Sequence, residues 1–219
     1  MKHLFFFAAA LLFSLAARAQ ELKEIKLNAP DKSRGSSVMQ ALDVRASARE
    51  MEETALSLQD LSDLLWAAYG TNRPDGRRTA PTAKNAQDID LYVCLPAGAY
   101  LYDARNNLLK PIASGDLRPA LASGQAFINK VPVVLLIVSD YSRFRLNDDE
   151  KARLWAAMDG GIVSQNINIF CAAVGLSTVP RAYMDQEQIK KALKLTDTQM
   201  PVLNNPVGYP KRAAVRPPV

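Results

Sequence analysis

The stretch NDDEKARLWAAMDGGIVSQNINIFCAAVG, residues 147–175, is typical of one long helix. Asn147 and Glu150 have the spacing of a capping box at its start, and Gly175 can end it after Ala173. At a rise of 1.5 Å per residue such a helix is about 40 Å long, comparable to the diameter of a whole domain. We therefore expect it at the centre of the core or of a subunit interface.

Two adjacent glycines, Gly160 and Gly161, lie in the middle of this helix. Each is less favourable there than alanine by about 1 kcal/mol. Their presence predicts a close approach to the helix backbone, by another helix or by a ligand.

A continuous apolar run, Val133–Val138, predicts a central strand covered on both faces. Elsewhere, β-branched and aromatic residues predict strands, and apolar residues at helical spacing predict helices. The expected strands are Ile89–Leu95, Ala99–Tyr102, Leu108–Ile112, Leu176–Pro180 and Val202–Gly208, and the expected shorter helices are Ser36–Asp43, Ser57–Tyr69 and Asp185–Lys194. This order indicates the α+β class, with a mixed, largely antiparallel sheet covered by helices and a long central helix.

The amino terminus resembles a cleavable signal peptide over residues 1–19. Lys2 and His3 precede an apolar run of about 14 residues, too short for a membrane-spanning helix, and small residues lie before Gln20. We expect cleavage between Ala19 and Gln20, export to a periplasm or beyond, and no membrane span afterwards; an uncleaved signal anchor is the alternative. Residues 20–35 then form a polar leader, and 36–219 form one domain.

The side-chain inventory excludes several kinds of chemistry. The one histidine, His3, belongs to the signal peptide, so the mature chain has no imidazole for a catalytic triad or a metal. Cys94 and Cys171 cannot form a four-thiolate metal site, and two buried free thiols are at least as well supported as a disulfide. We predict no metal site. The formal net charge of +5, without a dense basic run, does not favour nucleic-acid binding.

Basic residues gather in three places. In an extended RASAR segment, Arg45, Ser47 and Arg49 share one face, which suits a phosphate or another anion; a solvated charged turn is the simpler interpretation. The other two clusters are Arg73, Arg77, Arg78 and Lys84, and Lys211, Arg212 and Arg216. Because GxGxxG and GxxxxGK[ST] are both absent, a bound nucleotide cofactor would depend on such basic side chains.

Four segments together resemble the nitroreductase family of flavin mononucleotide (FMN) enzymes. They are RASAR (45–49), APTAKNAQ (80–87), DGGIVSQNINIFCAAVGLSTVPRAY (159–183) and VGYPKR (207–212), in the order that the family has. The segment SLQDLSDLLWAAYGTNR (57–73) is similar to the branch that includes thiazoline and oxazoline dehydrogenases. The resemblance implies a nitroreductase-like fold and a homodimer with FMN at its interface.

The resemblance also implies roles for particular residues. Arg45 and Ser47 would hold the phosphate and ribityl end of FMN, and Arg49 would reach the pyrimidine edge of the ring and stabilise its reduced form. Asn85 would bind the ring or the ribityl chain. Backbone groups of Pro180, Arg181, Ala182 and Tyr183 would lie against the ring near N5, and Lys211, Arg212 and Arg216 would complete the phosphate site. No catalytic side chain is implied, because the flavin carries the redox chemistry.

The implied reaction is a ping-pong electron transfer from a reduced small-molecule donor, usually NAD(P)H, to a nitro, quinone or related acceptor. Many members of the family have an acidic residue and then a glycine beside N5 of the flavin, where this chain has Ala182 and Tyr183. This difference affects which electron acceptor the resemblance implies. Two other classes of function remain: a non-catalytic protein of this fold that binds an anionic or small ligand, and a hydrolase that uses carboxylates. The carboxylates considered are Asp148, Asp149, Asp159 and Asp185, the first two being better explained as first-turn charges of the long helix.

Overall fold

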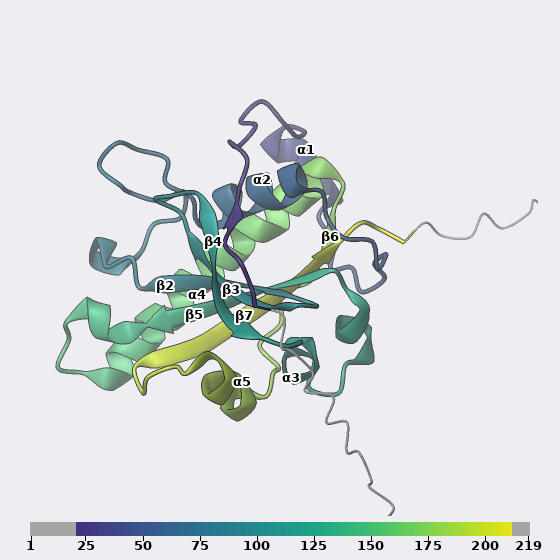
Figure 1. Cartoon of the computed structure of the whole chain (residues 1–219). Coiled ribbons are helices and arrows are strands. Elements are labelled where there is room, and N and C mark those ends of the chain that lie inside the picture. The colour runs from purple at the N-terminus through teal and green to yellow at the C-terminus, as the bar shows by residue number, and fades with distance from the viewer. Residues whose placement is uncertain (1–20, 212–219) are drawn as a thin grey trace, which may run out of the picture.

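The computed structural model of the chain describes residues 21–211, so the predicted signal peptide and the tail residues Arg212 and Arg216 lie outside the described residues. One seven-stranded sheet forms the centre of the molecule, in the order β1-β4-β3-β2-β5-β7-β6 (Figure 1). The strands are β1 Ile25–Lys26, β2 Ile89–Leu95, β3 Gly98–Asp103, β4 Leu108–Ser114, β5 Val133–Asp140, β6 Ser177–Thr178 and β7 Gln199–Gly208. Every pair of neighbouring strands is antiparallel, which confirms the prediction of a largely antiparallel sheet; the described strands show no parallel pair, so the sheet is not mixed.

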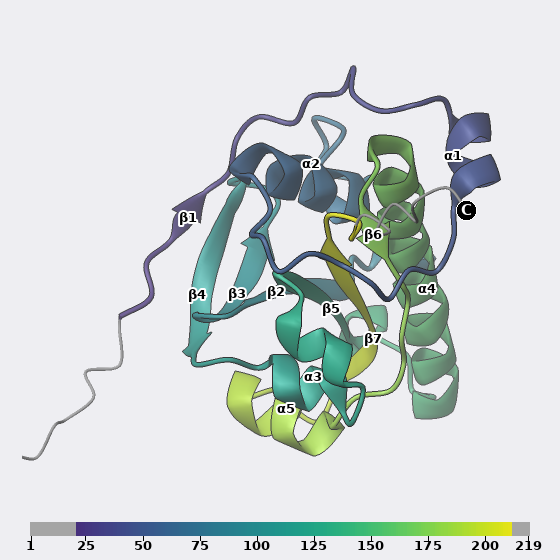
Figure 2. The same cartoon turned by 90° about the vertical axis from the view of Figure 1, so that its right-hand side faces the viewer.

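Helices cover both faces of the sheet. They are α1 Val38–Val44, α2 Leu58–Tyr69, α3 Arg118–Ala122, α4 Asp149–Val174 and α5 Gln186–Leu193, with 3-10 turns η1 Ala83–Asn85, η2 Ala126–Lys130 and η3 Tyr141–Phe144. Helices α2 and α4 lie on one face, and α3 and α5 on the other (Figure 2). The α+β prediction is confirmed. The sequence analysis missed β1, α3 and the 3-10 turns, because each has too few residues to show a hydrophobic period.

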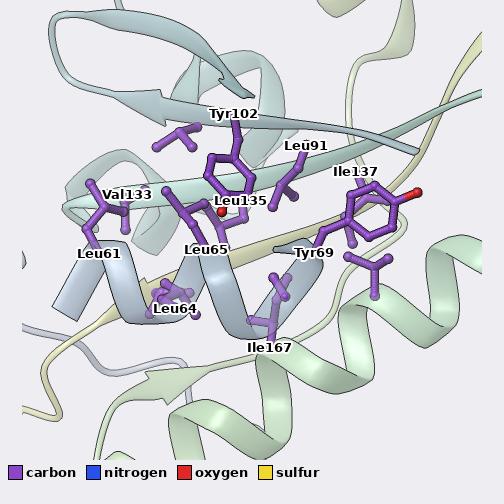
Figure 3. Packing of buried hydrophobic residues seen from close by; sticks show 14 of the residues in the cluster. Leu61, Leu64, Leu65, Tyr69, Leu91, Tyr102, Val133, Leu135, Ile137 and Ile167 are labelled. Carbon is purple, nitrogen blue, oxygen red and sulfur yellow. The ribbon is translucent and has the colours of Figure 1, made fainter. Parts of the chain in front are cut away.

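Strand β5 lies between β2 and β7, and its alternate side chains reach both cores. Val133, Leu135 and Ile137 pack against α2 and α4 (Figure 3). Val134 and Leu136 enter the core on the opposite face, beneath α3 and α5. The expected doubly covered strand is therefore confirmed, because a continuous apolar run satisfies two cores only when neither face meets solvent.

The long helix α4 begins one residue later than the predicted cap. Asp148, and not Asn147, is the N-cap, and its side chain accepts a hydrogen bond from the backbone N–H of Lys151 at 2.9 Å. Asp149 and Glu150 occupy the first turn, where their charges favour the helix dipole. Gly175 ends the helix as predicted, in the left-handed conformation with φ of 76°.

The two helix glycines have different surroundings. A Cβ atom on Gly160 would lie 2.7 Å from Cγ1 of Val202 in β7, whereas a Cβ atom on Gly161 would meet nothing within 4 Å. Within residues 21–211, the close approach predicted from the glycine pair is found at Gly160, and a strand of the same chain makes it.

Residues 21–35, the predicted leader, are part of the folded structure. Strand β1 pairs with β4, and Leu27 is buried in the core. Arg34 forms ion pairs with Asp60 and Asp63 of α2. The leader thus crosses the outer side of α2 before the chain enters α1 (Figure 2).

Cys94 and Cys171 are both free and buried, on opposite faces of the sheet. This agrees with two unpaired thiols. Among residues 21–211, no helix combines the length and the apolar character needed to cross a membrane.

Candidate functional site

Three of the four family-like segments meet at one end of the sheet. The segment that follows α1 runs beside β6, where the N–H of Ala48 donates to the carbonyl oxygen of Thr178 at 2.9 Å. The tail then pairs with the same segment, since Met51 and Pro210 form an antiparallel bridge and Lys211 N–H donates to Glu50 O at 3.4 Å. RASAR, the 177–183 segment and the tail are thereby brought together.

Arg49 and Lys211 line one cavity of about 290 Å³ at this junction. Lys130 of η2 lines it too, together with Glu50 and Glu53. Glu53 forms an ion pair with Lys130 at 3.6 Å. Arg49 and Lys211 take part in none of the ion pairs of residues 21–211. The excess of cations lets the cavity accept an anion.

Arg45 and Ser47 are exposed at the same junction. Neither side chain takes part in a hydrogen bond or ion pair with another residue in the described part of the chain. An exposed guanidinium group and a hydroxyl without internal partners are free to bind a phosphate.

Arg181 differs from the other predicted site residues because its guanidinium group is buried. It donates to the carbonyl oxygens of Leu121 and Ala122, at 2.8 and 2.9 Å, and to Oδ1 of Asn204 at 2.8 Å. Burial, and then the nearby positive charge of Arg49, lower the pKa of Arg181. This side chain therefore fixes the 180–183 segment against β7.

The next two residues of that segment face outward. Ala182 is exposed, and Tyr183 is 65% exposed. Arg181 uses its own N–H and carbonyl groups in a bridge to Asn204 of β7. Within the described residues the N–H groups of Ala182 and Tyr183 make no backbone hydrogen bond, so they can serve as donors to a ligand.

Asn85 lies elsewhere. It is exposed beside Lys84 and Arg145 in a second cavity, of about 400 Å³. In the sheet register Ile89, which follows the Asn85 turn, is opposite Ser139, whereas Val207, which precedes the tail, is opposite Val133. The two positions are six residues apart along β5, roughly 20 Å, so a single chain does not bring Asn85 to the Arg49 cavity.

The tail is held by a buried carboxyl group in the first turn of α2. Tyr209 Oη donates to Oδ2 of Asp60 at 2.6 Å and accepts the N–H of Ser57 at 3.1 Å. Burial opposes ionisation of Asp60, but hydrogen bonds from Ser57, Tyr209 and Arg34 outweigh it and lower its pKa. The ionised Asp60 thus connects the leader, α2 and the tail that carries Lys211.

Other charged residues singled out from the sequence have structural roles. Arg78 donates to Gln87 Oε1 at 3.2 Å and lies over the ring of Tyr69. Asp148 and Asp185 are N-caps of α4 and α5. These contacts explain the residues without a hydrolytic centre.

Sequence analysis missed Lys130 at the first cavity and Asp88 beneath the Asn85 turn. Lys130 follows the motif AFIN in a 3-10 turn that has no detectable period. Asp88 is buried just before β2, and the only signal for it is a charge immediately preceding a strongly apolar strand.

Comparisons with known proteins agree on one family. Residues 42–209 match the nitroreductase family. A protein of Methanocaldococcus jannaschii named "Putative nitroreductase MJ1384" is 30% identical over 173 residues, which cover 75% of this chain and 86% of that protein. The crystal structure of a "putative nitroreductase" from Ralstonia eutropha matches with a TM-score of 0.80 and 33% sequence identity, over 87% of this chain and 90% of that chain.

A more distant likeness involves the Escherichia coli microcin synthetase McbBCD complex. One chain of it matches with a TM-score of 0.66 at 18% identity, over 95% of this chain and 85% of that chain, a similarity that shows the fold alone. With a family match over most of the chain and relatives at 30% identity or more, this chain belongs to the nitroreductase family.

Proposed function

We propose that the chain is an exported, FMN-dependent oxidoreductase. A reduced donor such as NAD(P)H and then a nitro, quinone or related acceptor would use one cofactor site in turn. The observation that carries this proposal is that the segment after α1 pairs with Thr178 and with the tail, and that Arg49 and Lys211 line one cavity at this junction.

The side chains at this junction have the donor set that FMN requires. The guanidinium groups of Arg45 and Arg49, the hydroxyl group of Ser47 and the ammonium group of Lys211 are all donors, and they suit a phosphate dianion. FMN, when bound, supplies reversible two-electron redox chemistry. The protein then has to bind it, orient it and stabilise negative charge on the reduced ring.

Arg49 is the residue best placed to stabilise that negative charge. It is exposed at the cavity, and the buried Arg181 adds a second positive charge close by. A fixed positive charge beside the edge of a ring that becomes anionic makes reduction more favourable. No histidine is required for this role.

The function is tested by the visible spectrum of the purified protein and by FMN titration. We expect a yellow protein that binds one FMN per chain and is bleached anaerobically by NADH or NADPH. Arg49→Gln should weaken FMN binding about ten- to hundredfold, since it removes a charge-assisted hydrogen bond, while the exposed hairpin variant Arg105→Gln should bind normally. A colourless protein that takes up no added FMN would refute the proposal, and FMN uptake without reduction would favour a non-catalytic ligand-binding protein.

The same proposal includes a homodimer, because the Asn85 cavity and the Arg49 cavity lie at opposite ends of the strands. A second copy could bring its Asn85 to the first copy's cavity. An apolar stripe on α4 supports such an interface: Leu154 and Met158 are each 55% exposed, and Ile162 follows at helical spacing. Helix α1, which packs against α4, exposes Val38, Met39, Leu42 and Val44.

Sedimentation of the wild-type protein should give a dimer. Met158→Glu should dissociate it and weaken FMN binding, because it places a charge within the apolar stripe. Ile112→Glu, at an exposed apolar position of β4, is the matched control and should remain dimeric. A wild-type monomer that binds FMN fully would contradict the shared site.

Export rests on residues 1–19, and mass spectrometry of the protein from a periplasmic extract tests it. The mature chain should begin at Gln20. A chain recovered only from the cytoplasm with its first residues intact would contradict this part of the proposal.

A further inference from the structure

Two buried carboxyl groups lie beneath the turn that carries Asn85. Asp88, just before β2, is fully buried, and Asp159, in the middle of α4, is 4% exposed. Ser139 Oγ donates to Oδ2 of Asp88 at 2.5 Å, while Oδ1 of Asp88 is buried and has no partner donor among the described residues. A buried carboxylate oxygen without a hydrogen-bond donor is unfavourable. Protonation relieves this cost if the new O–H group can donate to a neighbouring acceptor.

Asp159 is that neighbour. Burial first, and then the adjacent charge of Asp159, raise the pKa of Asp88 to about 7, although the hydrogen bond from Ser139 acts in the opposite direction. Neither carboxyl group forms an ion pair among the described residues. A proton on Asp88 can therefore give its free oxygen a hydrogen bond to Asp159.

Asp159 also holds the turn directly. Its Oδ2 accepts the backbone N–H of Ala83 at 2.8 Å, which joins the central helix to the start of the 83–87 turn. The turn is strained, because Lys84, Asn85 and Gln87 have φ values of 56°, 52° and 48°, in the left-handed region that non-glycine residues rarely adopt. Such a conformation persists only where surrounding contacts enforce it.

The cations on the elements around the pair have other partners. Lys84, on the turn itself, donates to the carbonyl oxygen of Phe144 at 3.1 Å. Burial, and then the charge of Asp88, raise the pKa of Tyr69, so its hydroxyl group stays neutral. Arg143 of η3 is bound by Asp90 and Asp140, and also donates to Gln87 O at 2.9 Å. Arg78 lies over the Tyr69 ring on the side of α2. Among the ion pairs of residues 21–211, therefore, no cation neutralises a second negative charge in the carboxyl pair.

We propose that Asp88 and Asp159 are positioning residues that share one proton and so hold the 83–87 turn, and with it Asn85, in its strained conformation. With the proton present, the pair has one negative charge, and Asp159 accepts the Ala83 N–H. When the proton leaves, two buried carboxylates repel each other, and the turn loosens. The role of Asn85 toward FMN rests on the proposed function, but the hold on the turn does not.

The test compares wild-type protein with Asp88→Asn, Asp159→Ala and the exposed control Asp149→Asn. Hydrogen exchange of residues 83–87, expressed as protection relative to the unfolded peptide, is measured in the apoprotein on both sides of neutral pH. We expect wild-type protection to fall about tenfold as pH rises through about 7, with the control behaving alike. Asp88→Asn, which has the same shape and no titratable proton, should stay protected throughout.

Asp159→Ala should lack that protection at every pH, because the acceptor for Ala83 N–H is gone. Wild-type protection that is constant across neutral pH, or an Asp88→Asn variant that titrates as wild type does, would overturn the proposal. If FMN binds, its affinity should weaken over the same pH range in wild type but not in Asp88→Asn. If the turn loosens with pH while FMN affinity stays constant, the link between the turn and FMN through Asn85 is overturned. If the protein binds no FMN at all, the proposed function fails, and hydrogen exchange alone decides whether the carboxyl pair holds the turn.

Discussion

Replacing each of the two adjacent helix glycines by alanine gives a matched experiment on how α4 meets the sheet. Both substitutions gain the same helix propensity, about 1 kcal/mol. At Gly160 the new methyl group would lie 2.7 Å from Cγ1 and 3.2 Å from Cβ of Val202, well inside the separation of about 3.5–4.0 Å that carbon atoms prefer. At Gly161 it would enter open space.

Overpacking of this kind destabilises a protein by about 1–3 kcal/mol. Gly161→Ala should therefore raise the free energy of unfolding by up to about 1 kcal/mol, while Gly160→Ala should leave it unchanged or lower it by up to about 2 kcal/mol. Because the propensity gain cancels between the two variants, their difference in the dissociated protein measures the clash alone.

The assay is urea unfolding followed by circular dichroism, with all proteins at one concentration because oligomerisation contributes to stability. Adding Val202→Ala to Gly160→Ala should recover part of the loss, since it removes Cγ1, the closest atom, and leaves only Cβ at 3.2 Å. Equal effects of the two glycine substitutions would refute the packing explanation.

Three further results are expected. Tyr209→Phe removes the hydroxyl group that binds Asp60 and should lower the free energy of unfolding by about 1–2 kcal/mol in urea titrations; an unchanged value would show that the tail is held otherwise. Cys94 and Cys171 should not react with a disulfide reagent until the protein is unfolded, because burial raises the pKa of both thiols, to about 12 for Cys94, and a native thiol that reacts at neutral pH would contradict this. Burial opposes ionisation of Asp103, but hydrogen bonds from Lys110 and Asn106 outweigh it and lower the pKa of Asp103. The ionised carboxylate should therefore stabilise the fold above about pH 4 and lose this contribution in acid. Asp103→Asn should make the free energy of unfolding less dependent on acid pH, and an unaltered acid profile would count against the Asp103–Lys110 pair.

The elements predicted correctly are those in which local pattern and tertiary packing agree. Residues 133–138 are apolar throughout because both faces of β5 are covered. Ser57 and Gly70 bound α2 at the predicted residues, although Gly70 is extended, with φ of −72°, and not left-handed. The capping-box spacing of Asn147 and Glu150 predicts Asn147 as the cap of α4. Asp148 takes that place since its own carboxylate reaches the N–H of Lys151.

The sequence predicted several of the basic residues at the candidate site, but not how they are buried or how far apart they lie. Local sequence gives no sign that the Arg181 guanidinium is buried, because its partners lie in α3 and β7. Nor does spacing along the chain show that Asn85 and Lys211 are at opposite ends of the sheet, which depends on the register of β5. Long-range contacts of this kind are fixed by the whole fold.

The backbone hydrogen bond between Lys211 and Glu50 determines when the candidate site can form during synthesis and folding. The candidate site needs residues from near both ends of the chain, and β7, the last long strand, must insert between β5 and β6 before the tail can reach it. A nascent chain whose residues 199–211 are still inside the ribosome therefore cannot assemble the cavity, whatever the state of the elements before them. Any cofactor must be acquired after Lys211 has emerged, and truncation before Lys211 would remove a lining residue of the cavity while most of the core could still form.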